Sequence, residues 1–286
     1  TELDRLLRSV DRAALVAGDP ISLVRAYDDP HDQEVAGLLV AMLAYGRVAS
    51  IKAKASQALQ ALAPSPARAV EDGRRLRRLQ GFVYRFQKND DVPRFLRAIG
   101  RVRRRYGSLG RTFASLAASG PPEPTYVTTM ERFVATIADE IEGELTYGLR
   151  YLLPRTSGQG AAKRLCLYLR WMIRPDDGVD LGTWTALGAD LDPARLIMPL
   201  DTHIARIGRY LRLTKRATND LRTALDITEH LRALAPRDPL RYDMALCHLG
   251  ISGACPQRRD PQLCEGCGLR RVCRLGPTPV GWSNRE

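Results

Sequence analysis

The sequence has no apolar run long enough to cross a lipid bilayer, and it begins with a polar amphipathic segment in place of an apolar signal. We therefore expect neither a membrane protein nor a secreted one, and place it in the reducing cytoplasm. No stretch alternates β-branched with polar residues, and no internal repeat or low-complexity segment occurs outside a few loops. With 44% hydrophobic residues, extensive disorder is also disfavoured.

Acidic residues are in short supply. The 286 residues include 32 Asp and Glu against 44 Lys and Arg, so the formal net charge is +12. An excess of this size favours nucleic acid as the partner, and for a bacterial protein it suggests activity at the nucleoid. A single basic run such as Arg101–Arg105 is typical of a solvated helix face. The argument therefore depends on the imbalance over the whole chain.

Apolar residues recur at helical spacing. Leu3, Leu6, Leu7, Val10 and Ala14 fall on one stripe, and a second stripe lies within residues 35–43. Proline and glycine clusters at residues 63–67, 119–124, 155–160 and 174–178 predict breaks between helices. The pattern predicts an all-α fold.

Cysteine is scarce, but four of the six cysteines lie close together in the order Cys255-x8-Cys264-x2-Cys267-x5-Cys273. Four soft thiolates among prolines and glycines can converge on one iron–sulfur cluster or one structural zinc, and the spacing leaves these two open. A disulfide framework is typical of small secreted chains and does not suit this one. Cys166, in an apolar helical pattern, is expected to be a buried structural thiol, as is Cys247.

Two segments upstream carry further chemistry. In residues 157–174 a glycine-bearing turn, with Ser157 as its expected N-cap, leads into a helix that begins near Lys163. Free backbone N–H groups at such a turn bind phosphate well. In residues 198–212, Asp201 precedes an amphipathic helix, where capping alone would explain an aspartate.

The order of these parts resembles the helix-hairpin-helix DNA glycosylase superfamily, of which endonuclease III is the familiar member, over roughly the C-terminal half of the chain. The segments KRLCLYLRWM and PLDTH look closest to an uncharacterised bacterial branch of it. The resemblance implies that Asp201 is the essential carboxylate and that Lys163 is the Schiff-base nucleophile of a glycosylase and abasic-site lyase. It also implies that the four clustered cysteines hold a [4Fe–4S] cluster.

Three departures from the superfamily pattern matter. The usual LPGVG hairpin is replaced by LPRTSGQG at residues 153–160, and the first cysteine gap is x8 where x6 is usual. Lys163 and Asp201 stand 38 positions apart, with residues 175–197 inserted between them. This longer connection is similar to that of archaeal 8-oxoguanine glycosylases, and for that reason we favour an oxidised purine such as 8-oxoguanine as the excised base.

Further site residues follow from the resemblance, with structural roles as the alternative for each. The expected DNA contacts are Arg47, Ser157, Gly158, Gly160, Arg164, Arg170, His203, Arg258 and Arg259. The expected lining of the base pocket is Tyr45, Trp171, Trp184 and Asp243. Either Tyr45 or Arg47 would fill the gap left by the flipped base.

The resemblance predicts two helical lobes in a monomer. Residues 30–190 would form the central lobe with Lys163, and residues 1–29 with 191–286 the second lobe with Asp201 and the cysteines. The substrate would be double-stranded DNA with a damaged base. Two alternatives stay open: a non-catalytic iron–sulfur or zinc module that recognises damaged or structured nucleic acid, and an RNA-processing protein.

Overall fold

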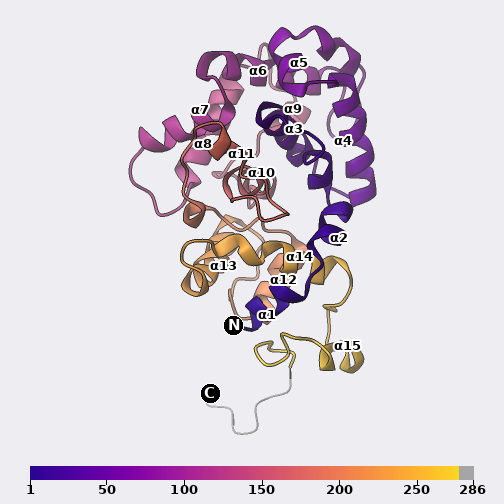
Figure 1. Ribbon diagram of the computed structural model, residues 1–286, viewed down its shortest axis with the longest axis vertical. Coiled ribbons are helices and arrows are strands. Elements are labelled where there is room, and N and C mark those ends of the chain that lie inside the picture. The colour runs from indigo at the N-terminus through magenta and orange to yellow at the C-terminus, as the bar shows by residue number, and fades with distance from the viewer. Residues whose placement is uncertain (277–286) are drawn as a thin grey trace.

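The computed structural model describes residues 1–276, which form helices joined by short connections (Figure 1). Helix accounts for 59% of the structure, and the described residues contain no strand, only an isolated bridge between Tyr84 and Gln87. The predicted all-α class is therefore confirmed. No helix within residues 1–276 combines the length and the apolar character that a membrane span needs.

The helices are numbered in chain order. The first eight α-helices are α1 (Glu2–Ser9), α2 (Arg12–Gly18), α3 (Pro30–Met42), α4 (Val48–Leu62), α5 (Pro66–Asp72), α6 (Asp91–Tyr106), α7 (Leu109–Ala118) and α8 (Val127–Asp139). The others are α9 (Tyr147–Leu152), α10 (Lys163–Ile173), α11 (Thr183–Ala186), α12 (Thr202–Tyr210), α13 (Leu221–Leu234), α14 (Asp243–Ile251) and α15 (Pro261–Glu265). Four short 3₁₀ segments are η1 (Pro20–Leu23), η2 (Arg74–Leu79), η3 (Pro193–Arg195) and η4 (Pro239–Tyr242).

Each of the four predicted breaks coincides with the end of one helix and the start of the next, although Pro66 and Ala67 of the first break already belong to α5. The first apolar stripe, however, belongs to two helices and not to one. Val10 has an extended backbone between α1 and α2, and Asp11 caps α2 by accepting a hydrogen bond from the Ala14 N–H. A local capping interaction therefore overrides the continuous helical spacing of the apolar residues.

Helix α3 lies in the middle of the larger group of helices (Figure 1). Its residues from Val35 to Met42 are all buried, so it is apolar on every side. It packs closely against α10, since a Cβ atom at Gly37 would lie only 2.9 Å from Met172 Cε, and Tyr168 Oη donates to the Glu34 carbonyl at 3.1 Å. This contact fixes the helix that begins with Lys163.

Helices α12 and α14 pack together at the other end of the molecule (Figure 1). A Cβ atom at Gly250 would come within 2.5 Å of His203 Cβ, so the two helix axes approach closely there. Helix α1 joins this end, where Tyr242 Oη donates to Asp4 Oδ1 at 2.9 Å. The segment that carries Asp201 thus packs on α14, and α1 contacts η4, which leads into α14.

Candidate active site

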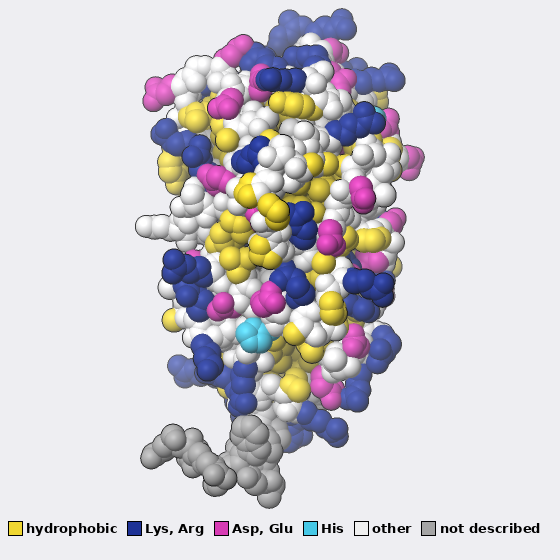
Figure 2. Space-filling model, turned by 90° about the vertical axis from the view of Figure 1, so that its left-hand side faces the viewer, with side chains coloured by type: hydrophobic (Ala, Val, Ile, Leu, Met, Phe, Trp, Pro, Cys, Tyr) yellow, Lys and Arg dark blue, Asp and Glu magenta, His cyan; other side chains and the backbone are white. Residues whose placement is uncertain are grey.

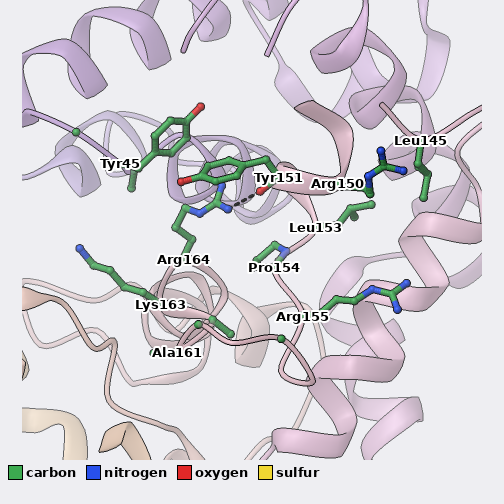
Figure 3. Close-up of a pocket in the computed structure, with 15 residues that line it drawn as sticks. Tyr45, Leu145, Arg150, Tyr151, Leu153, Pro154, Arg155, Ala161, Lys163 and Arg164 are labelled. Atoms are coloured by element: carbon green, nitrogen blue, oxygen red, sulfur yellow. Dashed lines mark hydrogen bonds between the residues drawn. The ribbon is translucent and has the colours of Figure 1, made fainter. Parts of the chain in front are cut away.

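A cavity of about 680 Å³ opens beside the first turn of α10 (Figure 3). Three segments line it: residues 44–46 after α3, residues of the 145–155 region around α9, and residues 158–164. Its volume falls within the range of sites that bind small molecules. Lys163 is part of the lining, whereas Asp201 is not.

Lys163 and Asp201 meet at the border of this cavity. Lys163 Nζ lies 3.4 Å from Asp201 Oδ2, although the two residues are 38 positions apart in the chain. The lysine side chain is 37% exposed and the aspartate side chain 15%. The lysine side chain is therefore partly exposed at the cavity, while the more buried carboxylate approaches its amine from the protein side.

The two oxygens of Asp201 have different tasks. Oδ1 caps α12 by accepting a hydrogen bond from the Ile204 N–H at 2.8 Å, which confirms the predicted N-cap. Oδ2 faces Lys163, and the Cys247 thiol lies 3.6 Å from the same oxygen as a second donor. Burial raises the pKa of Cys247 well above its ordinary value, with the charges of Asp201 and Asp243 adding to the rise, so this group is a thiol. The cap orients the carboxylate, and Lys163 and Cys247 both contact its second oxygen, Oδ2.

Helix α10 starts differently from the prediction. Its N-cap residue is Ala162, in the left-handed region at φ 47°, and it makes no side-chain capping bond. Ser157, the expected cap, instead donates its hydroxyl to Glu131 Oε1 at 2.9 Å. The expected cap was therefore wrong, because a carboxylate on α8 binds the serine and the helix begins six residues later.

Glu131 holds the whole turn before α10. Its Oε2 accepts hydrogen bonds from the Thr156 N–H at 2.8 Å and the Thr156 hydroxyl at 2.9 Å, and from the Ser157 N–H at 3.2 Å. Burial raises the pKa of Glu131, but these hydrogen bonds outweigh it and leave the pKa below its ordinary value. The exposed glycines of the turn, Gly158 and Gly160, are thereby positioned at the cavity. No spacing in the sequence marks Glu131 for this task.

Arg164 supports the wall of the cavity that Tyr45 and Tyr151 form. Its guanidinium lies 4.3 Å from the ring centre of Tyr151 and 5.3 Å from that of Tyr45, and it donates to the carbonyls of Met42 and Tyr151 (Figure 3). Burial lowers its pKa from the ordinary value. The guanidinium is thus engaged within the protein. The exposed arginines of the lining are Arg150 and Arg155, of which Arg155 lies 3.8 Å from Glu131 Oε1; both lie across the cavity from Lys163 in Figure 3.

The other face of α10 is structural. Trp171 and Trp184 are completely buried, and Arg170 is 2% exposed. Arg170 binds Asp180 at 3.0 Å and also pairs with Asp243, so both carboxylates are occupied. None of these five residues lines the cavity. We therefore leave the two tryptophans, Arg170 and Asp243 out of the proposed site.

The remaining expected contacts are spread over the surface. Arg47 is exposed just before α4, and the adjacent Arg258 and Arg259 are exposed in the cysteine segment. His203 is half-buried between α12 and α14. On the face drawn in Figure 2, Lys and Arg side chains are spread from one end of the molecule to the other, with acidic side chains among them. Only Tyr45 of the expected pocket aromatics lines the cavity.

The four clustered cysteines line one small cavity of about 30 Å³ together with Tyr210. All four are free thiols. Burial raises the pKa of Cys255, and the nearby thiols of the other three cysteines add to the rise, whereas Arg206 lowers it. In residues 1–276 no three His, Cys, Asp or Glu side chains already stand in a metal-ligand arrangement. The donor set suits a thiolate-bound centre, and the thiols lie around a common space.

With this geometry in hand, the protein is an all-α protein with a lysine–aspartate pair at the edge of a cavity. Residues 19–252 match the family described as Protein of unknown function (DUF2400), and the chain belongs to that family. The matched region contains Lys163 and Asp201 and ends before Cys255. No curated protein and no solved structure matches the chain.

Proposed function

We propose that this protein is a base-excision DNA glycosylase with abasic-site lyase activity, built on the helix-hairpin-helix glycosylase plan. The observation that carries the proposal is the 3.4 Å approach of Lys163 Nζ to Asp201 Oδ2 at the border of a cavity of about 680 Å³. An amine next to a carboxylate, open on one side to a space that can hold a base, is the arrangement that covalent excision requires. The net charge of +12 supports DNA as the partner.

Excision needs an extruded nucleotide, because C1′ is inaccessible inside the duplex. In its neutral form Lys163 attacks C1′ as the glycosidic bond breaks, and the bonding electron pair leaves with the base. Asp201 lies on the protein side of the amine, where its negative charge stabilises the cationic sugar and its free oxygen accepts the proton that the alkylated amine loses. Opening of the sugar ring then gives a Schiff base at C1′.

The same intermediate explains the lyase step. The Schiff base acidifies the C2′ proton, whose removal by a base expels the 3′ phosphate by β-elimination and breaks the strand. Hydrolysis of the imine then returns the free lysine. Arg150 and Arg155, exposed across the cavity from Lys163, are placed to contact the phosphates on either side of the extruded nucleotide.

The four cysteines would hold a [4Fe–4S] cluster or a structural zinc. Such a centre, when bound, supplies order to residues 255–273 and no chemistry at C1′. Arg258 and Arg259 are exposed between the first two cysteines, so such a centre would also position two cations. We propose that these two arginines contact DNA phosphates when the segment is held by its metal.

The oxidised purine remains the favoured base, on the likeness of the long connection between Lys163 and Asp201 to that of archaeal enzymes. The inserted residues themselves pack away from the cavity, since Asp180 binds Arg170 on the far face of α10. The pocket chemistry therefore has to be measured. A panel of duplexes, each with one lesion, is to be assayed for base release, with 8-oxoguanine expected to react fastest; no release from any duplex would refute the glycosylase.

The competing function is a DNA-binding module without catalysis. The pairing of Lys163 with Asp201 favours it in one respect, because two opposite charges at 3.4 Å also satisfy each other as a static ion pair. That module would bind DNA in a salt-sensitive manner, and Asp201→Asn would leave its function intact.

A further inference from the structure

An aromatic ridge runs outward from the candidate active site. We define it as Tyr45, Phe86, Tyr147 and Tyr151. Phe86 stands at its centre, 4.5 Å from the ring of Tyr151, 5.5 Å from that of Tyr147 and 6.0 Å from that of Tyr45, measured between ring centres. Tyr45 and Tyr151 line the cavity beside Lys163. Phe86 and Tyr147 line a second cavity of about 350 Å³. The ridge therefore connects the two spaces.

The outer half of the ridge is open to solvent. Tyr147 is 62% exposed and Phe86 39% exposed, which is unusual for large apolar rings that lie next to each other. The core does not need these two rings, because the side chains that the Phe86 loop buries are those of Tyr84 and Gln87, at 5% and 0% exposure.

The loop that carries Phe86 is rigidly braced. The backbones of Tyr84 and Gln87 bond to each other at 3.1 and 3.0 Å and close a tight turn, within which Arg85 has φ 51°. Gln87 Nε2 donates to the Gly148 carbonyl at 3.1 Å, and Tyr84 Oη donates to the Tyr45 carbonyl at 2.5 Å. The turn thus holds Phe86 out toward solvent in a fixed position.

Positive charge accompanies the rings. Arg85 and Lys88 line the second cavity, Arg150 lines the first, and all three are exposed. Within the part of the chain that the structure describes, none of them forms an ion pair. The acid groups of the second cavity are Asp90 and Asp91, and Asp91 is buried and turned inward to the Thr146 hydroxyl at 2.5 Å.

We propose that the aromatic ridge binds unpaired bases of single-stranded DNA next to the nucleotide that enters the cavity. Flat rings stack on any base, and cations along the ridge neutralise the phosphates between them, which is how single strands are held without sequence preference. This deepens the proposed function: the preferred substrate would carry its damaged base in an unpaired or locally opened stretch. A protein partner would not need free cations at both of the cavities that the ridge connects.

Binding of a labelled single strand without a lesion tests the ridge without any reaction. The probe is a 20-nucleotide oligonucleotide of mixed sequence, followed by fluorescence anisotropy and compared with the same sequence as a full duplex. Loss of one stacked base weakens binding by about fivefold to 150-fold. The double variant Phe86→Ala/Tyr147→Ala is therefore expected to bind the single strand at least about tenfold more weakly, with a smaller loss for the duplex.

Matched variants separate stacking from folding. Phe86→Trp and Tyr147→Phe keep an aromatic ring and should retain binding, and Leu234→Ala removes an exposed apolar side chain of 46% exposure on α13 without effect. A 2-aminopurine in the strand should lose fluorescence on binding to the wild type and keep it with the double variant.

Equal losses for single strand and duplex, or no loss at all, would overturn the ridge as a stacking site, as would displacement of the DNA strand by far lower concentrations of an RNA of the same sequence. The result does not depend on excision. The strand carries no lesion and no base is released in the assay, so a protein without excision activity can still support the ridge, and an active glycosylase can still refute it.

Discussion

Substitution of Asp201 can separate an effect on protein stability from an effect on catalysis, because one carboxylate oxygen caps a helix and the other faces Lys163. Oδ1 caps α12 through the Ile204 N–H at 2.8 Å, and Oδ2 faces Lys163 at 3.4 Å. In Asp201→Asn the amide oxygen can still cap, and asparagine is about as good an N-cap as aspartate. The lost ion pair is partly exposed, so we expect a change in the free energy of unfolding of less than about 1 kcal/mol. Asp201→Ala also removes the cap and should cost about 1 kcal/mol more.

The loss of base release should be similar in Asp201→Asn and Asp201→Ala, although their stabilities differ. Asparagine can neither accept the proton of Lys163 nor stabilise a cationic sugar, so both variants should lose base release by roughly 100-fold to 10,000-fold. The assays are single-turnover base release on the best duplex of the lesion panel and chemical denaturation of the same preparations. An Asp201→Asn protein with wild-type base release would refute the catalytic role, and so would an activity loss that appears only in the less stable alanine variant.

Three further predictions concern the support of the site. Glu131→Gln weakens the hydrogen bonds to Thr156. Because the pKa of Glu131 is lowered in the folded protein, its carboxylate stabilises the wild type above the ordinary pKa of a glutamate, and this stability is lost as the pH falls through the lowered pKa. Urea titrations between about pH 5 and 3 should therefore show a steeper loss of unfolding free energy in the wild type than in the variant. Arg170→Met leaves buried Asp243 without its partner and should cost about 3–5 kcal/mol of unfolding free energy, whereas a loss below about 1 kcal/mol would show that the buried pair is not needed. Cys264→Ser, purified anaerobically, should lose the visible absorption and the iron of the wild type; a colourless wild type with bound zinc would select the zinc alternative, and a wild type with neither would exclude a metal here.

Much of the fold was predictable because it depends on local signals. Proline and glycine clusters marked all four breaks, and Asp201 was identifiable as an N-cap from its place before an amphipathic helix. The N-cap prediction failed where a residue distant in the sequence forms a hydrogen bond with the expected cap. Ser157 has the right type and position for a cap, but Glu131 of α8 binds it. The spacing of residues along one helix contains no information about a carboxylate on another.

The candidate site was also predicted only in part. The order of motifs pointed to Lys163 and Asp201, and the structure brings them together. The aromatic residues of the pocket were predicted less well, because a helical pattern does not tell which side of a helix will be covered. Trp171 and Trp184 lie in the core, whereas Tyr151 and Phe86, which carry no motif, stand at the cavity and beside it.

The central claim is that the amine of Lys163 attacks a sugar carbon and holds it covalently. Borohydride trapping on a lesion-bearing duplex measures this directly, since reduction makes a Schiff base permanent. We predict a covalent protein–DNA adduct with the wild type, an equal one with the exposed-lysine control Lys215→Gln, and none with Lys163→Gln. No adduct with the wild type, or an undiminished adduct with Lys163→Gln, would contradict the account.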